Sequence, residues 1–403
     1  MSSSNDNKNL MADKKKLKKF NQIPYRIEVI EELTNDKLID SMIDFRNETT
    51  SSDVSSNCED IRELMPKKYL DFSKAIKDLG GKLLYIKSGS TGHTFKGVYP
   101  PEQSHMVNYA VKVVAYPRTE LYGDMFNVKR PENAELLMIS LLSYFVKKNQ
   151  TPHIILPITT FNTSIKTFIH LPKNKLVNNK KFDQFVKKYK KGEYYDNVSV
   201  LISEWANGGD LLDYIKNNYQ TFKTKHWRSI FFQFLSVMAI IQNKYPGFRH
   251  NDLKANNLLV QKIPVSKNNN KILYKINGQQ YVVPCIGIQI KLWDFDFACI
   301  PGIIDNSKVD AKWTSKININ AEQNRYYDIH YFFNTLTKKG FFPEFWDEDK
   351  VPEKIRNFVK RVVPDKFTTG KNISERGRIL INDEYLTADE ILKTDPLFKC
   401  MRL

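Results

Sequence analysis

Apolar runs in the first half of the chain predict an antiparallel sheet. Residues 84–98 read as two strands joined by a glycine-containing turn, and residues 109–114 form a β-branched run. A further apolar strand covers residues 200–203 and leads into a turn of small residues. Between these strands, residues 131–147 have helical periodicity, with Pro131 in the first turn. The pattern predicts a sheet-rich unit that contains one helix.

The second half of the chain is mainly helical in its periodicity. Residues 227–245 are apolar on nearly every face, which predicts a helix buried in the centre of a second unit. Residues 272–283 contain an Asn-Gly pair between two strand-like runs and predict a hairpin, which we expect to lengthen the strands that lead to Asp294. Residues 386–392 open as a capped helix.

Polar residues within this second half have a spacing typical of phosphoryl-transfer enzymes. Residues 250–257 read His-Asn-Asp-Leu-Lys-Ala-Asn-Asn, and Asp294 opens an Asp-Phe-Asp triplet after an apolar run. A phosphoryl group in transfer is surrounded by oxygen charge, so the protein must supply cations and metal ligands. We expect Asp252 to orient or deprotonate an incoming hydroxyl group and Lys254 to offset charge on the γ-phosphate of ATP. Asn257 and Asp294 are the candidate Mg²⁺ ligands.

The first predicted turn is a candidate phosphate-binding loop. Gly89 and Gly92 stand where a backbone would approach phosphate oxygens closely. Lys87 replaces the usual first glycine of such a loop, and Thr94 replaces the usual valine. A surface hairpin without a ligand is therefore an equally good interpretation of this segment.

A lysine in the middle of a β-branched strand needs a partner or a purpose if it is buried. Lys112 is such a residue, and we expect it to contact the α- and β-phosphates of ATP. Its predicted ion-pair partner is Glu135 on the following helix, with Glu132 as the alternative. Glu135 taken alone is equally well explained as a solvated helix charge.

The hinge segment, residues 204–210, joins an apolar strand to a helix. In a kinase this segment would be the hinge between two lobes, with backbone groups of Glu204 and Ala206 holding the adenine edge and Ser203 bordering its pocket. Asp210 is predicted to bond the ribose while it caps the helix. As a plain strand, loop and helix, the same segment needs no ligand.

In order and spacing, these motifs resemble the eukaryotic-type protein kinase fold over residues about 80 to 400. Residues 250–257, residues 293–298 and the Tyr-Tyr-Asp-Ile-His-Tyr-Phe-Phe run at 326–333 are similar to the poxvirus-type serine/threonine kinases of large DNA viruses. The resemblance implies an α+β bilobal fold, with an antiparallel-sheet small lobe and a mainly helical large lobe. It also implies that Asp328 supports the 250–257 loop from a buried helix.

The same resemblance implies a viral enzyme that phosphorylates serine or threonine in proteins. Its expected substrates are viral structural or membrane-associated proteins, and its expected location is the host cytoplasm or the virion. Lys254 supports serine and threonine specificity, because tyrosine-specific members usually lack this lysine.

Three departures from the family pattern affect these expectations. Asn251 stands where most kinases have an arginine that binds a phosphorylated loop, so control by such phosphorylation is not expected. Asp296 replaces the glycine after Asp294-Phe295, and residues 297–325 contain no Ala-Pro-Glu, so substrate docking is expected to be unusual.

A small-molecule or lipid kinase is one alternative, and a nucleotide-binding pseudokinase scaffold is another. The Gly-Gly-Asp hinge disfavours the first, and the retained catalytic set disfavours the second.

Length and composition fit a two-lobed unit. The chain has 403 residues with 41% hydrophobic content, enough for a large core. We divide it into a polar basic tail at 1–25, an extension at 26–80 expected to pack on the small lobe, the small lobe at 81–203 and the large lobe at 204–403. No apolar run is long enough for a transmembrane segment, and the N-terminus lacks an apolar signal core.

Charge and cysteine usage add two expectations. A net charge of +17 favours anionic partners such as ATP, acidic peptides, nucleic acid or acidic lipid. The lysine run at 14–19 is nevertheless most simply a solvated tail. The basic run at 180–191 is likewise most simply a solvated run, and it is expected in an insertion before the hinge. Cys58, Cys285, Cys299 and Cys400 have no metal-ligand spacing, which favours a reducing cytosolic setting, and Cys299 is expected to be a buried inert thiol.

Overall fold

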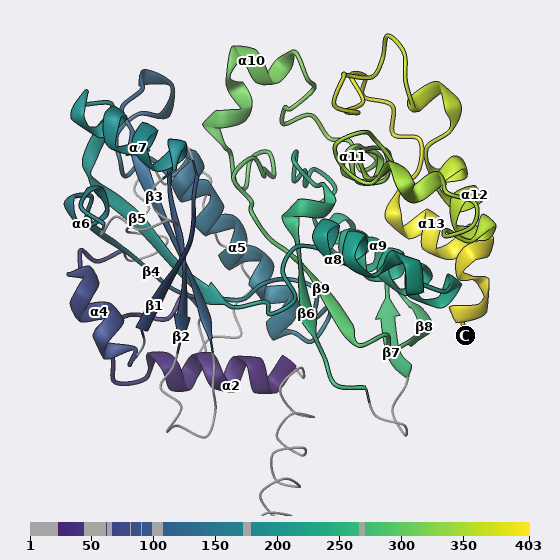
Figure 1. Cartoon of the computed structure of the whole chain (residues 1–403), viewed down its shortest axis with the longest axis horizontal. Helices are drawn as coiled ribbons and strands as arrows, with labels where there is room; N and C mark the ends of the chain where they lie inside the picture. Colours follow the sequence, from purple (N-terminus) through teal and green to yellow (C-terminus); the bar gives the residue numbers. More distant parts are fainter. Residues whose placement is uncertain are drawn as a thin grey trace, which may run out of the picture.

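The computed structural model describes residues 23–43, 62, 67–80, 82–89, 91–98, 108–171, 179–265 and 271–403. The predicted lysine run at 14–19, Cys58 and Ser90 of the glycine-containing turn lie outside these residues. The described chain forms a small lobe built on one sheet and a large lobe that is mainly helical, as Figure 1 shows. The predicted boundaries of the lobes, 81–203 and 204–403, stay a prediction.

The small lobe contains one five-stranded sheet in the order β1-β2-β3-β5-β4, with every neighbouring pair antiparallel. The strands are β1 (Lys82–Ser88), β2 (Gly92–Val98), β3 (Tyr109–Pro117), β4 (Pro157–Ser164) and β5 (Tyr194–Glu204). Side chains alternate between the two faces of a strand. In β3 the alternation buries Val111 and Val113 in the core and leaves Lys112 on the opposite face.

Five helices accompany the sheet in the described part of the small lobe and its extension. They are α2 (Ile23–Thr34), α4 (Phe72–Asp78), α5 (Pro131–Lys147), α6 (Lys166–Ile169) and α7 (Lys180–Lys190). Helix α5 has the predicted bounds. The prediction of a single helix was wrong for this lobe, because the basic run at 180–191 also carries Phe182 and Phe185, which are buried against His93 of β2.

The N-terminal extension packs on the small lobe, as expected. Helix α2 contacts both α5 and β4, and Figure 1 shows it running beneath the sheet. It begins at Ile23, so it includes the last residues of the segment 1–25 that the sequence assigned to a polar tail. Ile30 and Leu33 supply its buried face. Helix α2 thereby lies beside β4, which pairs with β5, the strand that leads into the hinge segment.

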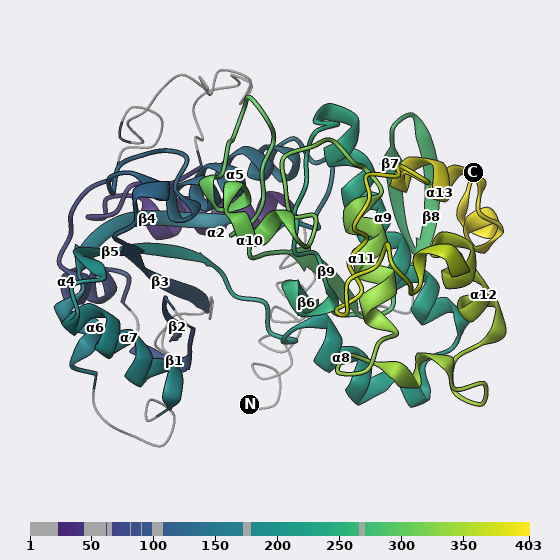
Figure 2. The same cartoon turned by 90° about the horizontal axis from the view of Figure 1, so that it is seen from above.

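The large lobe is built around one buried helix. Its helices are α8 (Leu211–Asn218), α9 (Thr224–Lys244), α10 (Lys312–Ser315), α11 (Tyr327–Leu336), α12 (Glu353–Val362) and α13 (Ala388–Thr394). Helix α9 is the predicted core helix and begins one turn earlier than Trp227. Phe234 of α9 stacks on Phe332 of α11, and Phe231 stacks on Phe358 of α12. Figure 2 shows α9, α11, α12 and α13 gathered on the side away from the sheet, where the C-terminus also lies.

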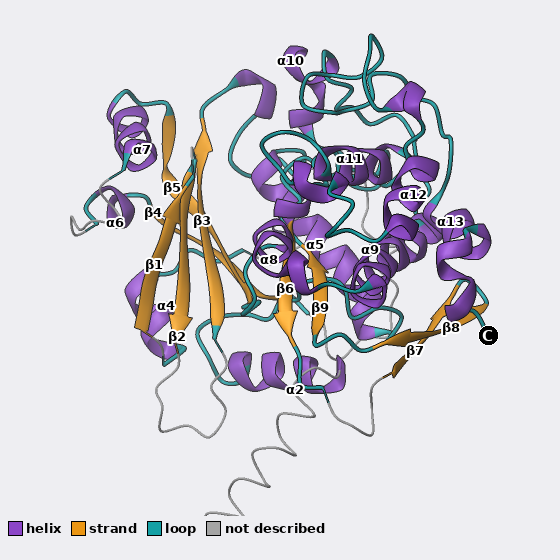
Figure 3. Ribbon diagram, turned by 45° about the vertical axis from the view of Figure 1, so that its right-hand side comes forward, coloured by secondary structure: helices purple, strands orange, loops and turns teal. Residues whose placement is uncertain are grey.

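In the described part of the large lobe, four short strands form two separate pairs. Strands β6 (Leu258–Lys262) and β9 (Ile288–Leu292) form one two-stranded sheet, and β7 (Lys271–Ile276) and β8 (Gln279–Pro284) form the other. The predicted Asn-Gly hairpin is confirmed, but the expectation that it lengthens the strands leading to Asp294 was wrong. Tyr274 and Tyr281 pack on Phe232 of α9 at centroid distances of 5.1 and 5.2 Å. This packing places the hairpin apart from β6 and β9 (Figure 3).

Helix α13 confirms the predicted capped helix near the C-terminus. Thr387 Oγ1 accepts a hydrogen bond from Glu390 N, and the Glu390 carboxylate accepts one from Thr387 N. This reciprocal pair is a capping box. Within the described residues, no helix is long and apolar enough to cross a bilayer.

Candidate active site

A cavity of about 510 Å³ lies where the small lobe meets the large lobe. Nine of the predicted site residues line it: Gly89, Gly92, Lys112, Glu135, Glu204, Ala206, Asp210, Asn257 and Asp294. Asp252 and Lys254 do not line this cavity, but Asp252 contacts Asn257, which does. The structure therefore brings all the predicted residues to one region from six separate segments of the chain.

Lys112 connects the two lobes across this cavity. Its Nζ lies 2.6 Å from Glu135 Oε1 on α5 and 2.9 Å from Asp294 Oδ1 after β9. Burial lowers the pKa of Lys112, but the carboxylates of Asp294 and Glu135 outweigh burial and raise the pKa above its usual value. Lys112 is therefore a fixed cation at the junction of the lobes.

Of the two carboxylates considered as the Lys112 partner, Glu135 makes the contact. Glu132 instead accepts a hydrogen bond from Arg130 Nε at 3.1 Å. Burial raises the pKa of Glu135, and Lys112 opposes that rise. Burial also raises the pKa of Asp294, but there the Lys112 ammonium outweighs it and lowers the pKa below its usual value.

The 250–257 loop places three polar side chains in mutual contact. Lys254 Nζ lies 2.8 Å from Asp252 Oδ2, and Asn257 Nδ2 donates to Asp252 Oδ2 at 2.9 Å and to Asp252 O at 2.8 Å. Because both Asn257 contacts use the amide nitrogen, its Oδ1 is left to accept or to ligate a cation. The loop ends in a short 3₁₀ turn, Ala255–Asn257, before β6 begins.

Helix α11 supports this loop through Asp328, as the sequence predicted. The buried Asp328 carboxylate accepts hydrogen bonds from His250 N at 2.7 Å and Asn251 N at 2.9 Å. Asn251 has a φ of 64°, a left-handed conformation that costs energy in a residue other than glycine. Asp328 offsets that cost by satisfying two buried amides of the strained segment.

Oxygen ligands for a magnesium ion are present in the cavity. Asp294 Oδ1 contacts Lys112, which leaves its other carboxylate oxygen, and Asn257 leaves its amide oxygen. Mg²⁺ prefers oxygen ligands and is usually held by one or two protein groups together with waters and phosphates. No group of three His, Cys, Asp or Glu side chains suited to a metal occurs among the described residues. A site with few protein ligands fits that preference.

The two glycines of the first turn differ in why the structure needs them. A Cβ on Gly92 would lie 1.8 Å from Val113 O of β3, so close pairing of the strands requires glycine there. A Cβ on Gly89 would meet its nearest atom at 3.7 Å, an ordinary contact. Gly92 is thus explained by sheet packing, whereas the packing leaves room for a side chain at Gly89.

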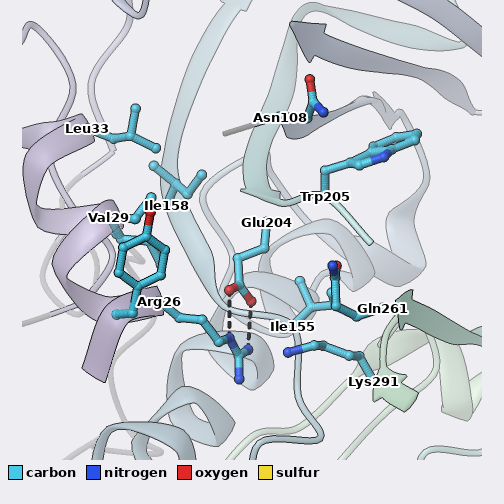
Figure 4. A pocket seen from close by; sticks show the side chains of 12 residues that line it. Arg26, Val29, Leu33, Asn108, Ile155, Ile158, Glu204, Trp205, Gln261 and Lys291 are labelled. Carbon is cyan, nitrogen blue, oxygen red and sulfur yellow. Dashed lines mark hydrogen bonds and ion pairs between the residues drawn. The ribbon is translucent and has the colours of Figure 1, made fainter. Parts of the chain in front are cut away.

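Helix α2 of the N-terminal extension contacts the start of the hinge segment through Arg26 and Glu204. The Glu204 side chain points toward Arg26 of α2 and accepts two hydrogen bonds from it, both at 2.7 Å (Figure 4). Arg26 also donates to Pro152 O at 3.0 Å and Ile154 O at 2.7 Å. Burial raises the pKa of Glu204, but Arg26 and then Lys291 outweigh it and lower the pKa below its usual value.

Asp210 caps helix α8, as predicted. Its Oδ1 accepts a hydrogen bond from Asp213 N at 2.9 Å. Burial raises the pKa of Asp210. Ser203, the predicted border of the adenine pocket, is buried and lines the cavity.

Residues in the segment after Asp294 neutralise the extra carboxylate of the triplet. Asp296 forms an ion pair with Lys308, whose Nζ also lies 3.9 Å from the centroid of the Phe297 ring. Cys299 is fully buried, as expected, and burial raises its pKa to about 12, which disfavours the reactive thiolate.

Sequence reasoning missed four cations that organise the site. They are Arg26, Arg249, Lys308 and Arg378. The clearest sequence signal for Lys308 was the extra carboxylate of Asp296, which needs a cationic partner. A chain this basic, however, offers many lysines as partners. Arg249 directly precedes the 250–257 loop, whereas Arg26 and Arg378 act from distant segments that no motif marks.

Comparison with known proteins identifies related chains. A model of the family described as poxvirus serine/threonine protein kinase matches residues 112–386. A protein of Acanthamoeba polyphaga mimivirus, named as a candidate serine/threonine-protein kinase, is 45% identical over 389 residues, which cover 94% of this chain and 80% of that protein. Serine/threonine-protein kinase 2 of Fowlpox virus (strain NVSL) is 25% identical over 286 residues, covering 68% of this chain and 57% of its own length.

Proposed function

Since the chain belongs to the poxvirus serine/threonine protein kinase family, we propose that it transfers the γ-phosphoryl group of ATP to serine or threonine side chains of proteins. The observation that carries the proposal is the position of Lys112 between Glu135 and Asp294, at 2.6 and 2.9 Å. A lysine held by one carboxylate in each lobe is the arrangement that an active protein kinase needs.

In this proposal ATP occupies the 510 Å³ cavity. Lys112 contacts the α- and β-phosphates, and Glu135 keeps the Lys112 ammonium in place. The backbone at Gly89 approaches the phosphates. Backbone groups of Glu204 and Ala206 bind the adenine edge, and Asp210 bonds the ribose at the start of α8.

Asp294 and Asn257 are the groups that would hold Mg²⁺. When bound, the ion offsets the negative charge of the phosphate oxygens. Asp294 and Asn257 fit this role because Lys112 contacts only one oxygen of Asp294, and Asn257 contacts Asp252 only through its amide nitrogen. Each therefore keeps a side-chain oxygen for a cation. Asp296 adds no free negative charge beside them, because it is paired with Lys308.

Asp252 receives the substrate hydroxyl group. The hydroxyl oxygen forms a bond to the γ-phosphorus, the bond between that phosphorus and the β,γ-bridging oxygen breaks, and ADP leaves. The hydroxyl proton passes to the Asp252 carboxylate and from there to solvent. Lys254, 2.8 Å from Asp252, offsets charge on the transferred group.

We also propose where the enzyme works. The related proteins named above are viral, which favours action in the host cytoplasm or in the virion on viral structural or membrane-associated proteins. Detection of the chain in purified particles, with particle proteins that lose phosphate when the chain is inactivated, would support this. Absence from both particles and infected cytoplasm would contradict it.

The test of the proposed activity is transfer of label from γ-labelled ATP with magnesium to generic acidic and basic protein acceptors. The Lys112→Met and Asp294→Asn variants are expected to lose transfer by at least about 100-fold. Lys82→Met, an exposed lysine at the start of β1 in the same sheet, is the matched control and is expected to keep wild-type activity. Equal activity in all four proteins would contradict the proposed roles.

Label transfer to small molecules alone would favour a metabolite or lipid kinase. ATP binding in a thermal-shift assay without transfer to any acceptor would favour a pseudokinase scaffold. Each result would overturn the proposal for protein substrates.

A further inference from the structure

An arginine that lies outside the kinase motifs in the sequence contacts the Asp252 carboxylate in the structure. Arg378 lies in the segment between α12 and α13, and its Nη2 donates to Asp252 Oδ1. Its Nη1 donates to Asn251 O and, at 3.1 Å, to the hydroxyl oxygen of Tyr327. The side chain is 7% exposed, so these contacts are made in a largely dry environment.

Helix α11 provides the surface on which Arg378 lies. The guanidinium carbon is 3.9 Å from the centroid of the Tyr331 ring, and Tyr327 lies one helical turn earlier on the same face. The same helix supplies Asp328, which accepts from the amides of the 250–257 loop. One helix therefore holds both the backbone of this loop and the arginine that contacts its carboxylate.

A tight turn delivers Arg378 to this position. Ser374 N donates to Arg378 O at 2.8 Å, and Arg378 N donates to Ser374 Oγ at 2.9 Å. Gly377, with a φ of +83°, provides the left-handed residue that the turn requires. Asn334 of α11 donates to Gly377 O at 2.9 Å. Because the turn is closed on itself and bonded to α11, the arginine is held before any substrate arrives.

The acceptor positions of Asp252 are nearly all in use. A carboxylate offers about four acceptor positions, two on each oxygen. Lys254 and Asn257 fill those of Oδ2, and Arg378 takes one of the two on Oδ1. Within the described residues, the contacts to this side chain thus leave one acceptor position, and it lies on the oxygen that Arg378 contacts.

We propose that Arg378 is a positioning residue for phosphoryl transfer, which orients Asp252 so that its one remaining acceptor position receives the substrate hydroxyl group. This inference rests on the proposed kinase activity. Arginine suits the role better than lysine, because its planar fork reaches Asn251, Tyr327 and Asp252 together and stacks on an aromatic ring. Arg378 does not line the nucleotide cavity, so it acts on the hydroxyl side of the reaction and leaves ATP binding unaffected.

The test compares the full-length wild-type protein with Arg378→Ala, Arg378→Lys and Arg361→Ala. Arg361 is the matched control, because it lies on α12 and forms its ion pair with Asp395. We expect Arg378→Ala to lower kcat on the order of 10- to 100-fold with the KM for ATP unchanged. Arg378→Lys should recover only part of the loss, and Arg361→Ala should keep the wild-type kcat.

Chemical rescue separates positioning from a merely structural role. Millimolar guanidinium chloride should raise kcat of Arg378→Ala severalfold and should not raise kcat of Arg378→Lys, whose ammonium fills the site. A wild-type kcat in Arg378→Ala would overturn the inference. A loss of kcat that guanidinium does not rescue, together with weaker ATP binding and a lower Tm, would also overturn the inference, because that result indicates a folding defect. If the wild-type protein transfers no phosphate at all, the proposed function itself fails.

Discussion

Removal of Arg26 tests whether the N-terminal extension supports the hinge segment. Arg26 contacts the Glu204 carboxylate through two hydrogen bonds of 2.7 Å, and their side chains are only 5% and 19% exposed. Arg26→Met leaves Glu204 buried without its main partner. Lys291 remains nearby, and burial followed by Arg26 keeps the pKa of Lys291 well below its usual value. Without Arg26, Lys291 gains a proton more readily and partly replaces the lost charge.

The size of the effect follows from this geometry. Two unit charges about 4 Å apart attract by about 4 kcal/mol at an effective dielectric constant near 20. Breaking a buried pair by removing one partner costs about 3–5 kcal/mol. Because Lys291 offers partial compensation, we expect Arg26→Met to lower the free energy of unfolding by about 3 kcal/mol, at the low end of that range. ATP affinity should also fall, since Glu204 begins the hinge segment.

The assay is a double-mutant cycle with Arg26→Met, Glu204→Gln and the double variant, measured by urea unfolding. The double variant should be less destabilised than the sum of the single variants by about 2 kcal/mol. Lys68→Met serves as the control, because its pair with Asp40 is about half exposed on both sides and should contribute less than about 1 kcal/mol. Effects at Arg26 and Glu204 that add within about 0.5 kcal/mol would refute the reasoning.

Three further predictions concern the loop, the sheet and the pH dependence of stability. Asp328→Ala leaves two buried amides without acceptors and should lower the free energy of unfolding by about 3–6 kcal/mol in urea titrations. An unchanged free energy of unfolding would contradict this role of Asp328. Gly92→Ala should lower Tm by several degrees because its Cβ meets Val113 O, whereas Gly89→Ala should leave Tm unchanged; equal Tm values would exclude the packing argument. Burial lowers the pKa of His153 to about 3, so the folded state binds fewer protons than the unfolded state between about pH 6.5 and pH 3. Stability should therefore fall as pH drops through this window, and His153 should account for about 2 kcal/mol of the loss at pH 5. His153→Gln should flatten the dependence of stability on pH. An unchanged slope in that variant would argue against a role for His153.

Local patterns in the sequence predicted most of the elements that form the site. Helix α5, the Asn-Gly hairpin and the α13 capping box each depend on neighbouring residues, so short-range rules found them. The motif spacing also brought Lys112, Glu135 and Asp294 together correctly, because a phosphate site constrains these residues jointly.

The failures involve contacts between segments distant in sequence. Whether a hairpin extends one sheet or packs on a helix depends on Phe232 of α9, which the hairpin sequence does not contain. Helix α7 was read as a solvated basic run, because the burial of Phe182 and Phe185 depends on His93 across the sheet. Arg378 reaches Asp252 from 126 positions away, and an arginine in a polar segment gives no local sign of its partner.

The measurement that tests the central claim most directly is the identity of the phosphorylated residue on a protein acceptor, determined by mass spectrometry after incubation with ATP and magnesium. The account predicts phosphoserine or phosphothreonine with the wild-type chain and none with Asp294→Asn. Phosphotyrosine alone, or serine phosphorylation that persists in Asp294→Asn, would contradict it.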